Sequence, residues 1–422
     1  MSNPSINFLQ QQAASLLLYQ NVLDNNVGRA FISLLSALKE GNSVHCLQAY
    51  GSWFKTLAET GKNWQDYLIQ QILWDDNPFS RQVQQISLDA LPPALIAAVQ
   101  YDLQALNSLY CCSEEQLSKW VRATCKMQEL PVVWYIEGTR SHFLHQHNNW
   151  SEVLPQLAEH YGQNGTGIFS RYRALRWQEG QLKGISHADP IQLTEIVGYE
   201  TQKAILIKNT EFLLAGYPAL HVLLYGSRGS GKSSLVKGLL GKFGDRGLRL
   251  IEVSKSELYD LSAILEQLRN ISQKFIIFVD DLSFEEDDEA FKSLKVVLEG
   301  SVTAKANNVL VYATSNRRHL IREFFEDRPR PRDSDEVHSW DTMQEKLSFS
   351  DRFGLTLTFE PANQDTYLEI IHHLALEANI NLETEDLEFR AKQWATRHNG
   401  RSGRTARQFI DFLTAELSLE NG

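Results

Sequence analysis

Hydrophobic residues repeat with a helical period in the first part of the chain. Phe31, Leu34, Leu35 and Leu38 occupy positions i, i+3, i+4 and i+7, which places their side chains on one face of an α-helix. Similar patterns predict that residues 1 to about 180 are mainly helical. The same half contains seven of the nine tryptophans. These either fill a helical core or form a surface that binds a partner, since large aromatic side chains serve both purposes.

The hydrophobic pattern of the second half predicts a parallel β-sheet. Short, nearly continuous apolar runs alternate there with helical patterns, and they lie at 222–225, 248–253, 275–279, 309–313 and 355–359. Strands that are apolar on both faces are typical of a parallel sheet with helices on both sides, so we expect an α/β fold. From about residue 364 onward only helical patterns remain, which predicts a small helical lid subdomain.

Glycine and proline residues between 178 and 192 indicate a connection between the two halves. Gly180, Gly184 and Pro190 stand there among polar residues, a composition that favours turns over regular structure. We therefore expect a mainly helical N-terminal domain at 1–185, an α/β domain at 186–362 and the helical lid at 363–422.

Composition and charge restrict the class of protein. A net charge of −11 argues against a protein that coats nucleic acid without sequence preference. No run of eighteen apolar residues is present, so we expect no membrane-spanning helix. The start of the chain lacks the basic and apolar segments of a secretory signal, and four cysteines are too few for a disulfide framework. We therefore expect a cytoplasmic protein.

The segment 226–233 matches the phosphate-binding pattern G-x-x-x-x-G-K-[ST] and lies between an apolar run and a helical pattern. Its glycines allow the backbone to wrap around phosphate, Lys232 supplies a compact positive charge for the terminal phosphates, and Ser233 supplies a hydroxyl for Mg²⁺. The following helix adds the positive end of its dipole. The pattern predicts ATP and Mg²⁺ as cofactors. The predicted contacts to ATP in this segment are Gly226, Ser227, Arg228, Gly229, Ser230, Gly231, Lys232, Ser233 and Ser234.

Two acids follow the apolar run 275–279. A carboxylate at the end of that strand lies beside the phosphate-binding loop, so we expect Asp280 to hold Mg²⁺ together with Ser233. Asp281 occupies the position of a base that orients the attacking water.

Three further residues complete a predicted catalytic set with Lys232 and Asp281. Asn316 ends the next strand, where a polar side chain faces the crevice that binds ligands, so it is a candidate sensor of the γ-phosphate. Arg352 precedes the last strand and Arg404 opens a helix. Planar guanidinium groups suit the terminal phosphates of a nucleotide.

Taken with Ile196-Val197-Gly198-Tyr199-Glu200, these motifs stand in the order seen in AAA+ ATPases, and this resemblance covers about residues 190–420. Phrases such as 281–285, 313–320 and 350–354 look more narrowly like the bacterial AAA+ family filed as domain of unknown function 815. The resemblance implies the AAA+ sheet topology, with Ile196, Val197 and Tyr199 at the adenine. It also implies self-association as a ring or filament, in which Arg352 acts in trans on a neighbour's nucleotide and Arg404 couples the lid to the γ-phosphate.

Two departures from the family bear on activity. Many AAA+ enzymes have Glu where this chain has Asp281, which is one methylene shorter, so we expect slow turnover. AAA+ replication initiators resemble this chain in carrying paired Asp, which suits an ATP switch. The segment 254–260 lacks the aromatic-aliphatic-glycine loop that is usual in AAA+ proteins that thread polypeptides.

Three functions stay open at this stage. The first is a slow ATPase that remodels or switches a protein partner held by the N-terminal domain. The second is a DNA-associated loader or initiator-like switch, although no nucleic-acid-binding motif supports it. The third is an assembly protein that nucleotide merely stabilises. Neither the His142, His145 and His147 cluster nor the basic segment 328–332 is expected to bind a metal or nucleic acid.

Overall fold

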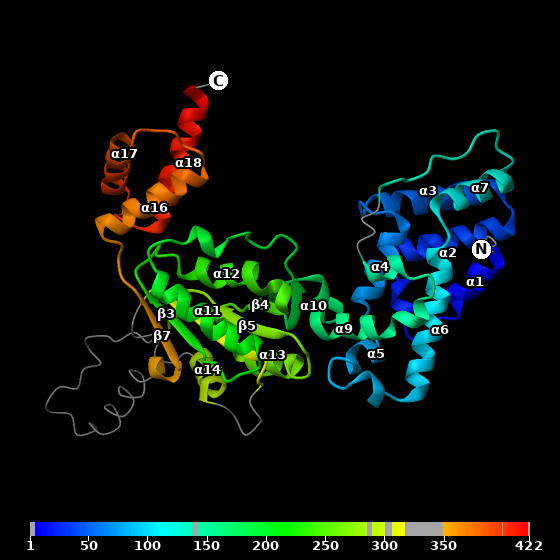
Figure 1. The fold of residues 1–422 in the computed structure, drawn as a ribbon, viewed down its shortest axis with the longest axis horizontal. Coiled ribbons are helices and arrows are strands. Elements are labelled where there is room, and N and C mark those ends of the chain that lie inside the picture. The colour runs from blue at the N-terminus through cyan, green and yellow to red at the C-terminus, as the bar shows by residue number, and fades with distance from the viewer. Residues whose placement is uncertain are drawn as a thin grey trace. The chain divides into compact units, whose positions relative to one another are not determined.

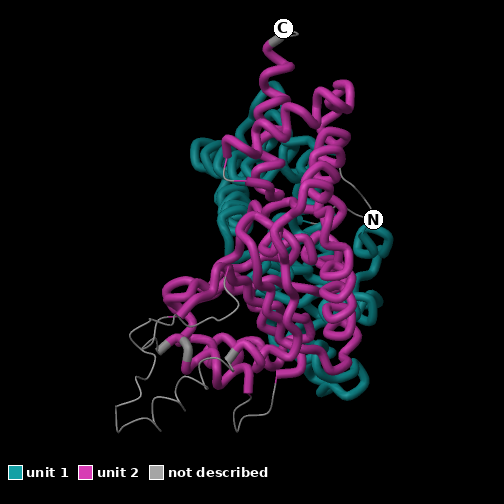
Figure 2. The backbone as a smooth tube through the Cα atoms, turned by 90° about the vertical axis from the view of Figure 1, so that its left-hand side faces the viewer, with its two compact units in different colours: residues 1–171 teal, residues 172–422 magenta. Residues whose placement is uncertain are grey.

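The computed structural model describes residues 5–137, 142–284, 289–299, 306–316, 349–398 and 400–420. The basic segment 328–332 and residues 317–320 lie outside this part of the chain. The chain forms two compact units, Met1–Arg171 and Tyr172–Gly422, which Figure 2 shows in teal and magenta. In the described residues, no helix combines the length and the apolar character needed to cross a membrane.

Unit 1 is helical, as the sequence predicts. Its helices are α1 (Ile6–Ala14), α2 (Asn26–Glu40), α3 (Ser43–Ala58), α4 (Trp64–Trp74), α5 (Pro78–Gln82), α6 (Pro93–Tyr110), α7 (Glu114–Cys125), α8 (Phe143–Gln146), α9 (Leu154–Asn164) and α10 (Gly167–Arg171). Helix α2 contains the predicted apolar stripe, whose side chains are buried. The Asn25 side chain caps its first turn by accepting from the Gly28 N–H, and Gly41 ends it with φ 74°.

Tryptophan side chains form much of the core of unit 1. Trp53, Trp64 and Trp150 are fully buried, and the ring of Trp64 stacks on Phe31 with centroids 4.3 Å apart. The indole N–H groups of Trp64 and Trp150 donate to backbone carbonyls, which removes the cost of burying them. For these three residues, core packing is the correct one of the two interpretations.

Unit 2 is built on a seven-stranded sheet in the order β2-β1-β4-β5-β6-β3-β7. The strands are β1 (Ala174–Gln178), β2 (Gln181–Gly184), β3 (Val222–Gly226), β4 (Leu248–Glu252), β5 (Lys274–Val279), β6 (Val309–Ser315) and β7 (Leu355–Phe359). The last five correspond to the five predicted apolar runs, and each pairs in parallel with its neighbours. The carboxyl ends of β3, β5 and β6 therefore meet at one edge of the sheet.

The predicted connection at 178–192 is in part a β-hairpin. Strands β1 and β2 pair around a two-residue turn in which Glu179 and Gly180 have φ values of 55° and 75°. Positive φ at both positions fits the twist of a tight hairpin. Since β1 also pairs in parallel with β4, the hairpin extends the sheet, and the two units divide at 171 instead of 185. Gly180 belongs to this turn and Gly184 ends β2, while residues 185–192 follow the hairpin outside any helix or strand.

Helices cover both faces of the sheet (Figure 1). Helices α11 (Glu200–Leu214) and α12 (Lys232–Phe243) pack on one face through an apolar cluster, while α13 (Leu261–Leu268) and α14 (Glu289–Glu299) lie on the other. The C-terminal helices α16 (Gln364–Glu377), α17 (Thr384–Arg397) and α18 (Gly403–Glu420) enclose a cluster of their own. The α/β fold with a helical lid and a helical N-terminal region is thus confirmed.

Asp75 is one of the buried carboxyl groups of unit 1. Asp75 is 4% exposed, and its carboxylate accepts a hydrogen bond from Asn77 Nδ2 at 2.7 Å. Burial raises the pKa of Asp75 from its ordinary value of 3.8 to about 7, with the nearby Asp76 and Asp102 adding to the rise. The folded state therefore holds this proton more tightly than the unfolded state does, so ionisation of Asp75 opposes folding.

We expect the stability of unit 1 to fall as the pH rises from about 4 through about 7, because the unfolded chain loses the Asp75 proton over this range while the folded chain keeps it. Asp75→Asn should remove this decrease and raise the unfolding temperature at about pH 8, where the effect is on the order of 4 kcal/mol. The measurement is thermal unfolding followed by tryptophan fluorescence across this pH range. Asp89→Asn, at an exposed position, is the control. An Asp75→Asn protein with the pH dependence of the unchanged chain would contradict the assignment.

Candidate functional site

The loop between β3 and α12 is held tightly against β7. Gly226 has φ 142°, and a Cβ atom built there would lie 1.9 Å from the Phe359 carbonyl oxygen. The next amide, that of Ser227, donates to the same oxygen at 2.9 Å. Only glycine fits at this point, so Gly226 determines where the strand stops and the loop begins.

The side chain of Lys232 lies beneath this loop. Its Nζ donates to the carbonyl oxygens of Gly226 at 3.0 Å and Ser227 at 2.7 Å, and the residue is 6% exposed. Burial lowers the pKa of Lys232, and Arg404 lowers it further, while the carboxylates of Asp280 and Asp281 raise it. The amine is therefore a poorly solvated positive charge, which an anion in the adjoining cavity would stabilise.

Asp280 joins three elements through one oxygen. Its Oδ1 accepts from the Ser233 hydroxyl of α12 at 2.6 Å, and it also accepts from the Thr314 hydroxyl of β6. The carboxylate itself follows the last residue of β5. Ser233 and Asp280 therefore present two oxygen donors close together, which is the ligand chemistry that Mg²⁺ prefers.

A second chain of hydrogen bonds leads from Asp281 to the lysine. Asn316 Nδ2 donates to Asp281 Oδ1 at 2.6 Å, and Asn316 Oδ1 accepts from Lys232 Nζ at 3.3 Å. Asp281 has φ 51°, and its N–H donates to the Thr314 hydroxyl at 2.9 Å. A positive φ is uncommon outside glycine, and the hydrogen bonds to Thr314 and Asn316 hold the Asp281 backbone and carboxylate in this conformation.

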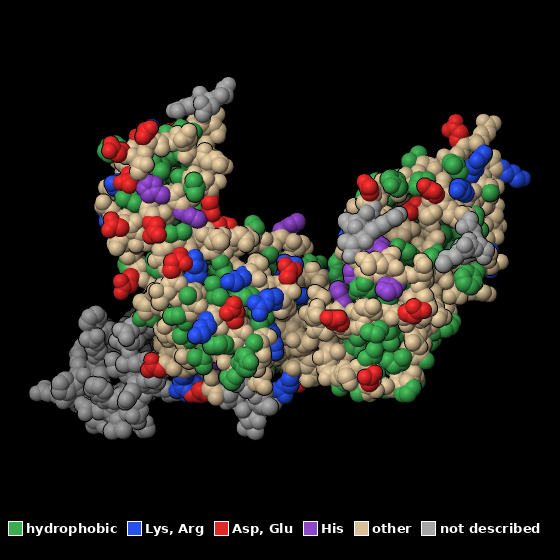
Figure 3. Space-filling model, in the orientation of Figure 1, with side chains coloured by type: hydrophobic (Ala, Val, Ile, Leu, Met, Phe, Trp, Pro, Cys, Tyr) green, Lys and Arg blue, Asp and Glu red, His purple; other side chains and the backbone are tan. Residues whose placement is uncertain are grey.

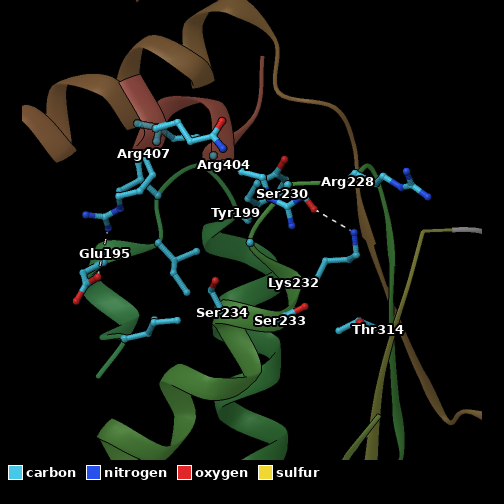
Figure 4. A pocket seen from close by; sticks show the side chains of 18 of the residues that line it. Glu195, Tyr199, Arg228, Ser230, Lys232, Ser233, Ser234, Thr314, Arg404 and Arg407 are labelled. Carbon is cyan, nitrogen blue, oxygen red and sulfur yellow. Dashed lines mark hydrogen bonds and ion pairs between the residues drawn. The ribbon is translucent and has the colours of Figure 1, made fainter. Parts of the chain in front are cut away.

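These side chains line a cavity of about 830 Å³ between the loop and the lid (Figure 4). One wall is apolar and combines residues before α11 with residues of α16: Ile191, Ile196, Val197, Tyr199, Ile370 and Leu374. The Tyr199 hydroxyl donates to the Glu360 carbonyl at 2.7 Å, which fixes the ring against Phe359. The polar wall is cationic near the lid, where Arg404 and Arg407 enter from α18 and Arg407 pairs with Glu195 at 3.4 Å.

Backbone atoms connect the lid to the phosphate-binding loop. The Arg404 N–H donates to the Gly229 carbonyl at 3.2 Å. Gly229 has φ 74°, and a Cβ atom there would lie 2.8 Å from the Ser402 hydroxyl. The first residues of α18 therefore rest directly on the loop.

The structure brings most of the predicted site residues together at this cavity. Its lining includes the residues Ile196, Val197, Tyr199, Arg228, Gly229, Ser230, Gly231, Lys232, Ser233, Ser234, Asp280, Asp281, Asn316 and Arg404. Gly226 and Ser227 lie behind the lining and form its support. Arg352 does not line the cavity. It ends a 3-10 turn at Phe349–Arg352 and pairs with Glu299 of α14.

Several lining residues are absent from the sequence-based prediction. Thr314 stands two residues before the predicted sensor Asn316. Its position near the end of the same predicted strand could have indicated that its side chain also reaches the cavity. Arg407 lies one turn after Arg404 on α18, which was a further signal. Ile370 and Leu374 belong to the apolar stripe of α16, and no local pattern distinguishes such residues from the core of the lid.

The three histidines near residue 145 do not form a metal site in the described residues. No group of three His, Cys, Asp or Glu side chains there is arranged to hold a metal ion. His145 pairs with Asp66 at 3.0 Å, and the His142 ring accepts from the Leu144 N–H in the first turn of α8.

The chain is similar in sequence to a protein family and to a known relative. The sequence model of a family described as "Protein of unknown function (DUF815)" matches residues 170–417. A probable spastin homolog of Brugia malayi is 27% identical over 162 residues, which are 32% of this chain and 35% of that protein. The chain thus spans about a third of that relative's length.

Solved structures similar to this chain include RuvB of Thermotoga maritima, titled a Holliday junction branch migration motor. It is 16% identical, with a TM-score of 0.33, over 53% of this chain and 72% of that one. A mutant of the same protein aligns with a TM-score of 0.34. From the family match, the order of the motifs and the sheet, the chain belongs to the DUF815 family within the AAA+ ATPase superfamily.

Proposed function

We propose that this protein binds ATP with Mg²⁺ in the cavity between the loop and the lid and hydrolyses it slowly. We further propose that it works in the cytoplasm as a homo-oligomer, and that ATP-driven self-association switches or remodels a protein partner held by unit 1. The observation that carries the proposal is the connected set of hydrogen bonds from Ser233 through Asp280 to Thr314, and from Lys232 through Asn316 to Asp281.

The phosphate side of the cavity supports nucleotide binding. The Lys232 amine is bound by two neutral carbonyls, and phosphate oxygens would be stronger acceptors for it. A triphosphate there would also lie near the N-terminus of α12, where the backbone N–H groups and the helix dipole favour anions. The apolar wall of Ile196, Val197 and Leu374 suits the faces of an adenine ring.

The residues present fit Mg²⁺, because Ser233 and Asp280 offer hard oxygen donors beside the predicted phosphates. When bound, the ion would bridge phosphate oxygens and neutralise their charge. Thr314 holds the Asp280 carboxylate by donating to the oxygen that also accepts from Ser233. Thr314 is thus a positioning residue for the metal ligand.

Asp281 and Asn316 support hydrolysis. We assign to Asp281 the role of orienting the attacking water and accepting its proton, and to Asn316 that of fixing the carboxylate and contacting the γ-phosphate. The carboxylate of Asp281 reaches one methylene less far than a glutamate would. This shorter reach places the base less well and supports slow turnover.

The two arginines differ in position, and we assign them different roles. Arg404 lines the cavity from the lid, so it contacts the terminal phosphates of its own subunit. Arg352 lies outside that lining, paired with Glu299, and so we assign it to the nucleotide of a neighbouring subunit. An arginine supplied in trans contributes a factor of about 10³–10⁵ to the rate in phosphoryl transfer.

Replacing Lys232 by Ala is expected to lower the affinity for ATP at least ~100-fold, because the charge-assisted bonds to the phosphates are lost. The measurement is equilibrium binding of a fluorescent ATP analogue to the full chain. Lys237→Ala, on the same helix, is the matched control and should bind as the unchanged protein does. Undiminished binding by Lys232→Ala would remove the proposed site.

Thr314→Val should raise the Mg²⁺ concentration needed for half-maximal turnover about 10-fold, because the carboxylate of Asp280 loses the hydroxyl that orients it. Thr314→Ser should restore the requirement of the unchanged protein, since it keeps the donor. Thr358→Val, exposed on β7, controls for the loss of a strand hydroxyl. A Thr314→Val protein with an unaltered Mg²⁺ requirement would show that Thr314 does not act through the metal ligand.

Mixing subunits tests whether sites are shared. Lys232→Ala and Arg352→Ala proteins should each lack turnover, and their mixture should regain part of it, because the first supplies Arg352 to the intact loop of the second. The control mixes Lys232→Ala with a variant that carries both Lys232→Ala and Arg352→Ala. No subunit in that mixture has an intact phosphate-binding loop, so no complete site can form. Turnover is measured as phosphate release, with and without added DNA. Absence of rescue would count against action in trans, and turnover that requires DNA would favour a DNA-associated switch.

A further inference from the structure

Residues 128–137 form a surface segment of unit 1 that is neither helix nor strand, with a bend at residues 128–129. Before the segment, at the end of α7, the Cys125 thiol contacts the Ser43 carbonyl in the first turn of α3. Within the segment, Trp134 Nε1 donates to the Lys62 carbonyl, which lies beyond the last turn of α3. Helix α3 has 16 residues and is therefore about 24 Å long. The nine steps from Cys125 to Trp134 would span only about 14 Å as a helix, but about 30 Å when extended.

The backbone of this segment is unpaired. Among the described residues, no hydrogen bond between backbone groups involves residues 128–137. The segment is fixed by side chains of the unit: the Tyr50 hydroxyl donates to the Val132 carbonyl at 2.7 Å, and Asn63 Nδ2 donates to the Ile136 carbonyl at 3.3 Å. The Ser118 hydroxyl also donates to the Pro131 carbonyl at 2.9 Å. Among the described residues, no hydrogen bond reaches the backbone N–H or C=O groups of Val133 and Tyr135.

The side chains of the segment combine strand-forming character with exposure. Val132 is 76% exposed and Tyr135 is 77% exposed, while Trp134 packs edge-on against Phe54 of α3. β-Branched and aromatic residues favour the strand conformation. An extended edge with free N–H and C=O groups is the surface to which a peptide of another protein adds as a β-strand.

A cationic cleft adjoins the start of the segment. Lys119 and Arg122 of α7, and Lys126, which caps its C-terminus, line a cleft of about 420 Å³ together with Met127 and Leu130. Figure 3 shows the blue side chains gathered there. Within the part of the chain that the structure describes, none of the three cations forms an ion pair. In a chain of net charge −11, this local excess of positive charge selects an acidic partner.

We propose that the 128–137 segment and the cationic cleft form one docking site for an extended peptide segment of a partner protein. The peptide adds as a β-strand along Val133 and Tyr135, and its acidic residues lie over Lys119, Arg122 and Lys126. The inference deepens the proposed function by giving the partner a chemistry, and binding at this site in unit 1 needs no nucleotide.

The test uses the full chain without nucleotide and a labelled peptide of about ten residues, whose first half is acidic and whose second half alternates Val and Thr. Fluorescence anisotropy should show binding of this peptide in preference to a version with Lys in place of the acids and to a version interrupted by Pro. Hydrogen exchange read by mass spectrometry should show slower exchange of residues 128–137 in the complex.

Variants separate the two parts of the site. Reversing the three charges (Lys119→Glu, Arg122→Glu and Lys126→Glu) should weaken binding of the acidic peptide at least ~10-fold. The control reverses two exposed lysines of α2 and α3, by Lys39→Glu and Lys55→Glu, and should leave binding of the acidic peptide unchanged. Tyr135→Pro removes an N–H that has no hydrogen-bond partner among the described residues and should also weaken binding, while its thermal unfolding stays unchanged.

Three results would overturn the inference. These are equal binding of the acidic and basic peptides, unchanged exchange of residues 128–137 in the complex, and binding of single-stranded DNA to the three cations with no binding of the peptide. The Lys232→Ala protein separates this inference from the proposed function. If it loses ATP but binds the peptide as before, the docking site stands by itself; if ATP binding is normal and the peptide fails, only the docking site is lost.

Discussion

The Asp280 Oδ1 atom holds together the three elements that form the candidate site. Asp280 Oδ1 accepts from Ser233 at the start of α12 and from Thr314 at the end of β6, and Asp280 itself follows β5. Three elements that are far apart in the sequence are thereby held at one point. The Thr314 hydroxyl could not be moved by one residue along β6 without breaking the set, since alternate residues of a strand face opposite sides of the sheet.

The sheet explains why this convergence is possible. Strands β3, β5 and β6 are parallel, so their carboxyl ends lie at the same edge, and the loop, the acids and the asparagine each leave a strand there. The loop is further constrained by β7, whose Phe359 carbonyl leaves no room for a side chain at Gly226. The position of the phosphate-binding loop thus depends on a strand that begins more than a hundred residues later.

The strands and most of the site were predictable because their signals are local. The five apolar runs and the motif 226–233 each depend on neighbouring residues, and the order of motifs supplies the rest. The hairpin β1–β2 was not predictable in the same way, because its strands are short and its turn residues Glu179 and Gly180 resemble a linker. Ile370, Leu374 and Arg407 reach the cavity only through the placement of the lid, which no local pattern of hydrophobic residues encodes.

The bond between the Arg404 N–H and the Gly229 carbonyl has a consequence for how the lid senses the loop. It is made by backbone atoms, so any residue except proline at 404 would keep it, and mechanical contact between lid and loop survives loss of the guanidinium. Position 229 has no such tolerance because a side chain there would push Ser402 away. The side chain at position 404 can therefore change during evolution while the backbone contact between α18 and the loop is kept.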